Sequence, residues 1–112
     1  MENNSLSRSE LTVIASDISI TGNVELSQEL HLYGKITGEV KGGEGSILVL
    51  KEGSLVEGRI HVDTVIIDGF VRGEIHSSRK IWVTGRGKIM GSVRTPSLQV
   101  DPGAVFEAKV SM

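Results

Sequence analysis

Ile67–Ile75 reads Ile-Asp-Gly-Phe-Val-Arg-Gly-Glu-Ile. Every second residue of this stretch is apolar or a glycine, and a period of two is typical of a β-strand that is buried on one face. Phe70 is the one apolar residue on the alternate, polar face. Two glycines spaced four apart would weaken an ordinary strand. They therefore indicate that the chain bends sharply, or that another backbone comes close, at these positions.

The same pattern recurs along the chain. Leu32–Val40 matches it position for position, and Val83–Val93 carries it with one additional Gly-Arg step. Including the shorter copies, the anchor residues are separated by 16, 20, 15, 18 and 17 residues; they are Gly22, Gly38, Gly58, Gly73, Gly91 and Ala108. Such self-similarity indicates stacked repeats, none of which can bury its apolar face alone. A period this short favours an all-β solenoid with three short strands in each coil.

Length and composition fit a single domain built in this way. The chain has 112 residues, of which 14 are glycine and only 4% are aromatic, which suits a narrow core of stacked aliphatic side chains. It has no cysteine, and we find no signal peptide or membrane-spanning run. We expect residues 1–10 to form a short disordered tail and residues 11–112 to form the β-helix domain.

The two ends of this domain are the candidate functional sites. Repeat proteins usually need polar caps, and no polar capping helix follows the last coil. An uncapped coil exposes unpaired backbone groups and apolar side chains, which form a template for another chain. We therefore predict polymerisation through both terminal coils. The expected C-terminal contact consists of Leu98, Val100, Phe106 and Val110, and the expected N-terminal contact of Leu11, Val13, Ile14, Ile18 and Ile20.

Charge is unevenly placed along a chain whose net charge is −2. The first half is acidic, whereas the stretch from Arg72 to Arg94 is basic. This stretch is either a partner surface for an anionic molecule or a solvated outer face. Its basic residues are Arg72, Arg79, Lys80, Arg86, Lys88 and Arg94. Nucleic-acid binding is disfavoured because few aromatic residues accompany these charges.

The sequence predicts no metal site. His61 and His76 hold equivalent positions in successive repeats, so in stacked coils the two imidazoles would lie one strand spacing, about 4.8 Å, apart. A metal ion needs three or four ligands, and only Asp63 is an obvious third. Stacked surface side chains are the simpler interpretation.

Catalysis and cofactor binding are also disfavoured. Asp63 with Asp68, or Glu57 with Glu74, could form the carboxylate pair of a sugar-cleaving β-helix, but these short coils leave no room for the long loops that build a cleft. The glycine-rich stretches lack the Lys-Ser/Thr ending of a phosphate-binding loop, so we expect no nucleotide. We predict no catalytic, cofactor-binding or metal-binding residue.

The repeated Ile/Val-x-Gly-x-Val-x-Gly-x-Ile pattern, together with the ending from Thr95 to Met112, resembles the bactofilin family. The resemblance covers about residues 11–112. It implies a right-handed, three-sided parallel β-helix that forms non-polar filaments without nucleotide by joining coil ends. It also implies a bacterial cytoskeletal scaffold that localises cell-wall enzymes and influences cell shape. Some members carry a hydrophobic N-terminal membrane motif, which residues 1–10 do not clearly supply.

We therefore predict a structural protein rather than an enzyme, with itself as the first partner and cell-wall-modifying or morphogenesis proteins as further partners. Its expected location is the cytoplasm, with a peripheral position at the inner membrane left open. The alternative is a β-helix adaptor that does not polymerise and binds a protein or peptidoglycan partner. A particle size that is independent of concentration would distinguish the adaptor from the polymer.

Overall fold

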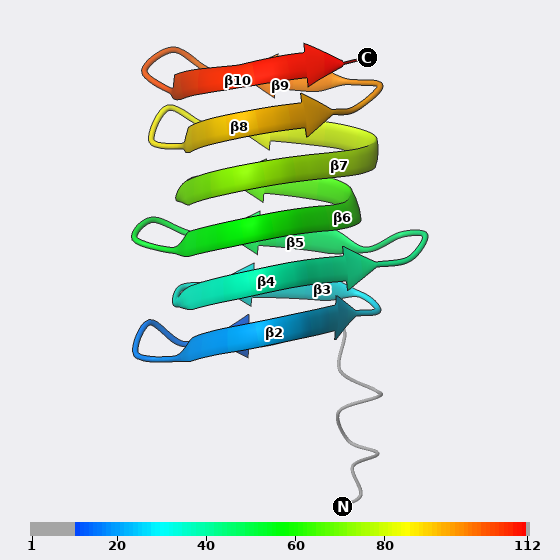
Figure 1. The fold of residues 1–112 in the computed structure, drawn as a ribbon, viewed down its shortest axis with the longest axis vertical. Coiled ribbons are helices and arrows are strands. Elements are labelled where there is room, and N and C mark those ends of the chain that lie inside the picture. The colour runs from blue at the N-terminus through cyan, green and yellow to red at the C-terminus, as the bar shows by residue number, and fades with distance from the viewer. Residues whose placement is uncertain (1–10, 112) are drawn as a thin grey trace, which may run out of the picture.

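The computed structural model describes residues 11–111, with the side chain of Leu11 excepted. In this range the chain forms ten strands and no helix (Figure 1). The strands are β1 (Leu11–Ile14), β2 (Ser19–Leu26), β3 (Glu29–Leu32), β4 (Lys35–Gly42), β5 (Ile47–Leu50), β6 (Leu55–Ile67), β7 (Phe70–Val83), β8 (Lys88–Arg94), β9 (Leu98–Val100) and β10 (Val105–Ser111). The expected tail, residues 1–10, lies outside the described residues.

Every strand pairing is parallel, as expected when successive coils stack on one another. One ladder contains β2, β4, the first half of β6, the first half of β7, β8 and β10. The other contains β1, β3, β5, the second halves of β6 and β7, and β9. In Figure 1 the front strands run to the right while the chain climbs from the N-terminus, so the solenoid is right-handed.

The predicted anchors form one column at a corner of the solenoid. Gly22 pairs with Gly38, and the same register continues through the later anchors up to Ala108. The five glycines have φ between 124° and 138°, a conformation that residues with a Cβ rarely adopt. A Cβ added at Gly58 would also lie 1.9 Å from the carbonyl oxygen of Gly38. The predicted sharp bend and close backbone approach are therefore both present.

This corner divides each long strand between two sides, and the second ladder forms the third side. Side A comprises the residues before the corner, Ser19–Thr21 in β2 and their register partners. Side B comprises the residues after the corner, Asn23–Leu26 in β2 and their partners. Side C is the ladder of short strands that runs from β1 to β9. The six coils thus make the predicted three-sided β-helix.

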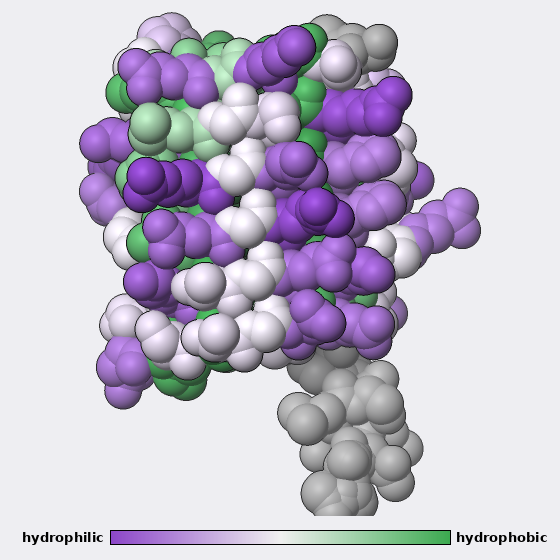
Figure 2. Space-filling model, in the orientation of Figure 1, coloured by the Kyte–Doolittle hydropathy of each residue, from purple (hydrophilic) through white to green (hydrophobic). Residues whose placement is uncertain are grey.

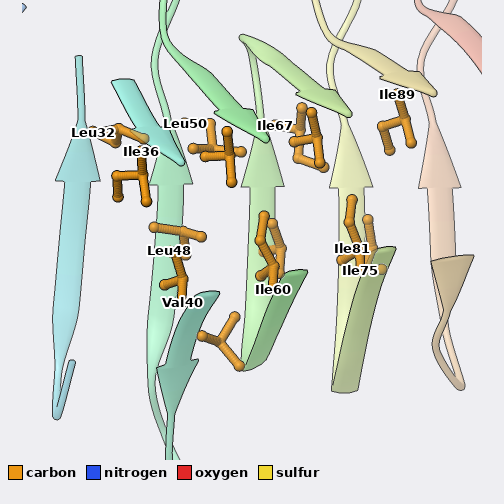
Figure 3. Packing of buried hydrophobic residues seen from close by; sticks show 14 of the residues in the cluster. Leu32, Ile36, Val40, Leu48, Leu50, Ile60, Ile67, Ile75, Ile81 and Ile89 are labelled. Carbon is orange, nitrogen blue, oxygen red and sulfur yellow. The ribbon is translucent and has the colours of Figure 1, made fainter. Parts of the chain in front are cut away.

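The core is a stack of aliphatic side chains from all three sides. Figure 3 shows Leu32, Ile36, Leu50, Ile67 and Ile89 directed toward the axis from β3, β4, β5, β6 and β8. All five have 0% of their surface exposed. Each coil contributes branched residues at the same register positions, so every layer packs against the layers above and below.

The sequence suggested a single strand over Ile67–Ile75, and the structure corrects this. β6 ends at Ile67, and the chain turns at Asp68 and Gly69 before β7 begins at Phe70. The alternation of inward and outward residues nevertheless continues through the corner, because Gly69 faces inward. A Cβ on Gly69 would lie 2.2 Å from Ser54 Oγ. A corner that continues the inward and outward alternation cannot be distinguished from a strand by period alone.

Candidate polymerisation interfaces

The C-terminal end of the solenoid presents the four residues predicted for that contact. They belong to the last coil and face the core, because their register partners one coil below are buried. Val100 is 42% exposed and Val110 is 39% exposed, whereas Leu98 and Phe106 are partly covered. The partners below, in the same order, are Val83, Val93, Ile81 and Ile89. The last coil therefore displays core side chains at its open end.

At the N-terminal end the structure brings together three of the five predicted residues. Ile14 and Ile20 lie in register with the buried Leu32 and Ile36, so both face the core. Ile18 occupies the corner position equivalent to the buried Ser54, yet it is 44% exposed because it belongs to the first coil. This end is thus also a partly open cross-section of the core.

The other two predicted N-terminal residues are placed differently. Val13 pairs with His31 on the outer surface of side C and is 54% exposed, so it does not belong to the open core of the first coil. The backbone of Leu11 pairs with Glu29, and its side chain lies outside the described part. Alternation along β1 separates Val13 from Ile14, because neighbouring residues of a strand face opposite ways.

Further core-facing residues of the terminal coils were missing from the predicted contacts. Four of them share columns with buried residues of the middle coils, and Ala108, in the glycine column, packs against the core; the five are Thr12, Val24, Leu26, Ala104 and Ala108. Val24 could have been found from the sequence, because the repeat aligns it with Val40. Thr12 could not have been found in this way, because a polar residue within an apolar run is not expected to face the core.

The six basic residues do not form one surface, which corrects their interpretation as a single partner surface. Arg72 and Lys88 lie on side A, Arg94 on side B and Lys80 on side C, while the other two lie at corners. Arg72 and Arg94 are 22 residues apart, which is more than one coil, so this stretch encircles the solenoid. Three of the six also face carboxylates, in the pairs Arg72–Glu57, Arg79–Asp63 and Arg86–Glu52.

Asp63 is the most enclosed carboxylate of the described residues and serves the corner between sides B and C. Its Oδ2 accepts a hydrogen bond from the Gly45 N–H at 2.7 Å, and its Oδ1 accepts one from the Ser78 hydroxyl. The side chain of Ser78, the backbone N–H of Gly45 and, more weakly, Arg79 lower the pKa of Asp63 from its usual value, against an opposing effect of burial. The ionised Asp63 side chain thus connects the segments that contain Gly45 and Ser78 through hydrogen bonds.

The predicted histidine stack is present. The rings of His61 and His76 lie with centroids 4.5 Å apart and planes at 4°, on the outer surface of side B. Lys41 and Arg94 occupy the neighbouring positions of the same column. Within residues 11–111, no group of three or more His, Cys, Asp or Glu side chains is arranged to hold a metal ion.

The carboxylate pairs considered for sugar cleavage do not come together. Asp68 lies at the corner between sides C and A, one side away from Asp63, and accepts a hydrogen bond from the Thr84 hydroxyl at 2.5 Å. Glu57 lies on side A and Glu74 on side B, with the glycine corner between them. Neither pair has the shared cleft that glycoside hydrolysis needs.

Three comparisons with known proteins agree with one another. A family model described as "Bactofilin: Polymer-forming cytoskeletal" matches residues 12–111. The chain is 27% identical to bactofilin BacP and 30% identical to bactofilin BacO, both of Myxococcus xanthus, over 90% of its own length. It spans 41% of BacP and 79% of BacO. Within the described part, which contains strands alone, no helix could span a membrane.

The structural comparison concerns the fold. The chain superposes on a subunit of a cryo-EM reconstruction of Thermus thermophilus bactofilin double helical filaments with a TM-score of 0.78 and 21% identity. The match covers 89% of this chain and 97% of that chain. The two chains therefore share the β-helix fold.

Proposed function

The chain belongs to the bactofilin family of polymer-forming cytoskeletal proteins, and from this premise we propose that it assembles into non-polar filaments, without nucleotide, through its two terminal coils. The observation that carries the proposal is the exposure of core-facing residues at both ends, Val100 and Val110 at one and Ile18 at the other. Joining two such ends removes apolar surface from water and gives the backbone groups of the outermost strands partners.

Nucleotide independence is supported by the roles of the glycine-rich stretches. Gly42–Gly45 and Gly85–Gly87 form corners between strands, where Gly45 and Gly87 serve the turn hydrogen bonds. A phosphate-binding loop instead leads from a strand into a helix, whose N-terminal N–H groups hold the phosphates. These corners offer no such arrangement, so filament growth should not respond to ATP or GTP.

The decisive test is electron microscopy of the purified protein in the absence of nucleotide, beside a Phe106→Arg variant. The introduced guanidinium would place a charge in an apolar joint at a cost of several kcal/mol, so filaments should disappear while the circular dichroism spectrum is unchanged. Glu107→Arg is the matched control, because Glu107 lies on the same strand but faces outward on side A. Filaments of the Phe106→Arg variant at wild-type density would show that the C-terminal joint is elsewhere.

Polarity can be tested with the same variant by light scattering after size exclusion. If like ends meet, blocking the C-terminal joint leaves the N-terminal joint free, and the Phe106→Arg variant should be a dimer. If unlike ends meet, every joint needs a C-terminal end, and the variant should be a monomer. We expect the dimer, as non-polar assembly requires. A wild-type protein of constant size at every concentration would instead favour the non-polymerising adaptor.

The polymer would act as a scaffold in the cytoplasm or at the inner face of the membrane, where its sides localise cell-wall or cell-shape machinery. Figure 2 shows charged and polar side chains over most of the face formed by the long strands, as expected for a surface exposed along a filament. A fluorescent fusion should form discrete structures in the cell, and the same fusion with Phe106→Arg should be diffuse. Discrete structures in both strains would show that localisation does not need the polymer.

A further inference from the structure

Side A presents an apolar strip to solvent that neither the core nor the terminal joints use. Each coil from the third to the sixth contributes one outward-facing residue to this strip, and the four are Leu55, Phe70, Met90 and Val105. Phe70, the one apolar residue on the polar face of its repeat, is half-buried beside Leu55. In Figure 2 apolar patches lie among charged side chains on the left part of the long-strand face, which is side A, whereas the right part is mostly hydrophilic.

The other two sides are less open to an apolar partner. Outside the terminal joints and the corners, the exposed large apolar side chains of the described residues are Val13 on side C and Met90 and Val105 on side A. In the middle of side C the protein covers its own apolar residues, because Val49 is 9% exposed and Lys80 Nζ lies 5.6 Å from the centre of the Trp82 ring. The outward columns of side B contain only polar and charged residues.

Phe70 borders a hollow at the edge of side A, where the chain turns from side C. The hollow has a volume of about 330 Å³; Leu55 and Lys88 line it together with Phe70, and Gly53 contributes no side chain to it. An apolar side chain of a partner that enters this hollow would contact the Phe70 ring. Side chains that fill such recesses near the centre of an interface carry much of its binding energy.

Lys88 stands in the middle of the apolar strip. In its column it lies between Phe70 and Val105, one coil from each. Within residues 11–111, Lys88 forms no ion pair. Covering an ammonium group without giving it a charged or hydrogen-bonding partner is unfavourable. A molecule that covers the strip must therefore bring a carboxylate to Lys88.

The other charges of side A favour the same kind of partner. Lys35 and Arg72 both face Glu57, at 3.8 and 3.7 Å, and the second carboxylate of this side is Glu107, in the last coil. Side A thus carries three cations against two carboxylates, and one of its cations already shares Glu57 with another. An acidic segment is attracted to such a surface, and a basic segment is repelled from it.

The dimensions of side A fit a single α-helix that lies along the solenoid axis. Three residues of a strand span about 10 Å, and a helix with its side chains is about 10 Å across. Successive coils rise about 4.8 Å, which is close to the rise between helix residues three or four apart, about 4.5 to 6 Å. In an extended segment the residues of one face lie about 6.7 Å apart, which does not match the coils.

We propose that side A binds an acidic amphipathic helix of a partner protein, with the apolar face of the helix on the strip from Leu55 to Val105 and a carboxylate at Lys88. The inference names the kind of partner that the proposed scaffold recruits, and it rests on that function. Four coils rise about 19 Å, the length of about 13 helical residues. This contact is smaller than the about 800 Å² per partner of a stable interface, so a single helix should bind reversibly. A filament repeats the site in every subunit and would retain a partner that carries several such helices.

The first experiment measures fluorescence anisotropy of three labelled peptides of about 14 residues, the length of a helix over four coils. One is a helix with leucines three and four apart and glutamates elsewhere, one has the same residues scrambled, and one has lysine in place of glutamate. The Phe106→Arg protein is used, so that binding does not depend on filaments. Only the acidic helix should bind, and adding Phe70→Lys should weaken its binding at least about tenfold.

Ile66→Lys is the matched control in this experiment, because Ile66 is a partly exposed apolar residue that faces outward on side C. It should leave the affinity for the acidic helix unchanged. Three results would overturn the proposal: no binding of the acidic helix, equal binding of the scrambled peptide, or an affinity that Phe70→Lys does not change.

A charge reversal tests the position of the carboxylate. Lys88→Glu should weaken binding of the acidic helix at least about tenfold and should create binding of the lysine helix. A misfolded variant cannot gain binding, so this reversal is independent of any loss of structure. A Lys88→Glu protein that still prefers the acidic helix would overturn the proposed contact at Lys88.

Two other occupants of side A are distinguished with the same variant. Sedimentation with vesicles of equal parts phosphatidylglycerol and phosphatidylcholine should not differ between the wild type and Phe70→Lys; a loss in the variant would overturn the proposal in favour of an anionic membrane. The filaments of both proteins should have the same mass per unit length, and a lower mass for Phe70→Lys would assign side A to a second copy of the chain. If the acidic helix binds but the wild type forms no filaments, the docking site stands and the proposed function fails.

Discussion

The middle and terminal coils contain the same kinds of residue at the same register positions, yet they behave differently. Val93 is 2% exposed, whereas Val110, its partner in the last coil, is 39% exposed. Val83 is 0% exposed and Val100, directly above it, is 42% exposed. The side chains are identical, and only the next coil is missing. The end of the solenoid exposes apolar side chains because no further coil covers them, although its composition is that of any other coil.

The glycine column shows the same contrast in the backbone. In the middle coils a Cβ at Gly58 or Gly73 would collide with the carbonyl oxygen of the coil below, at 1.9 and 2.0 Å. At Gly22, in the first coil, no described atom lies within 4 Å of that position. Ala108 occupies the column in the last coil, where φ is not positive. Glycine is therefore favoured in the middle coils for two reasons: its φ is positive, and the coil below leaves no room for a Cβ.

The largest effect is expected from Gly58→Ala compared with Gly22→Ala. At Gly58 the new Cβ meets both an unfavourable φ and the Gly38 oxygen, so we expect a loss of more than about 4 kcal/mol, or failure to fold. At Gly22 only φ of 124° opposes the change, and a loss of about 1–3 kcal/mol should follow. Urea denaturation in the Phe106→Arg background, at one fixed protein concentration, compares the two losses without the contribution of filament growth. Equal losses would show that backbone approach is unimportant.

An intermediate effect is expected from Val93→Ala compared with Val110→Ala. Removing two buried methyl groups and leaving a cavity should cost about 2 kcal/mol at Val93. The same deletion at Val110 should cost less than about 1 kcal/mol in the unassembled protein, because much of this side chain is already in water. In wild-type background, Val110→Ala should raise the protein concentration at which filaments appear, as sedimentation measures. An unchanged threshold would remove Val110 from the joint.

The smallest effect is expected at Asp63, the carboxylate that fastens the corner between sides B and C. Its pKa is lower in the folded protein than in the unfolded chain, so the folded state binds fewer protons. The stabilisation is complete above the ordinary pKa of aspartate, about 3.9, and disappears as the pH falls through the folded-state pKa. Asp63→Asn should therefore be less stable than the wild type at neutral pH, and the difference should narrow in acid. Urea midpoints across this pH range, with Phe106→Arg in both proteins, check the trend; a constant difference would contradict it.

Several features could be predicted from the sequence because they repeat. The anchors Gly22 to Ala108 gave the register of the coils, and the alternation around Gly73 gave the inward residues Val71 and Ile75. Residues in continuous apolar runs were harder to place. Leu11–Ile14 and Ile47–Leu50 have no period, so the outward direction of Val13 and Val49 became apparent only from their pairing with His31.

The sequence by itself determined the period, the glycine corners and the apolar columns, since each follows from local sterics and from the need of every coil to bury one face. The tertiary structure decided which residues from different coils share a surface. It dispersed the basic residues around the solenoid, separated Asp63 from Asp68, and brought Phe70 and Lys88 into one column on side A. Because the chain winds around an axis, the separation of two residues along the chain sets how far apart they lie around the solenoid and along its axis. Both distances depend on how many residues each corner contains.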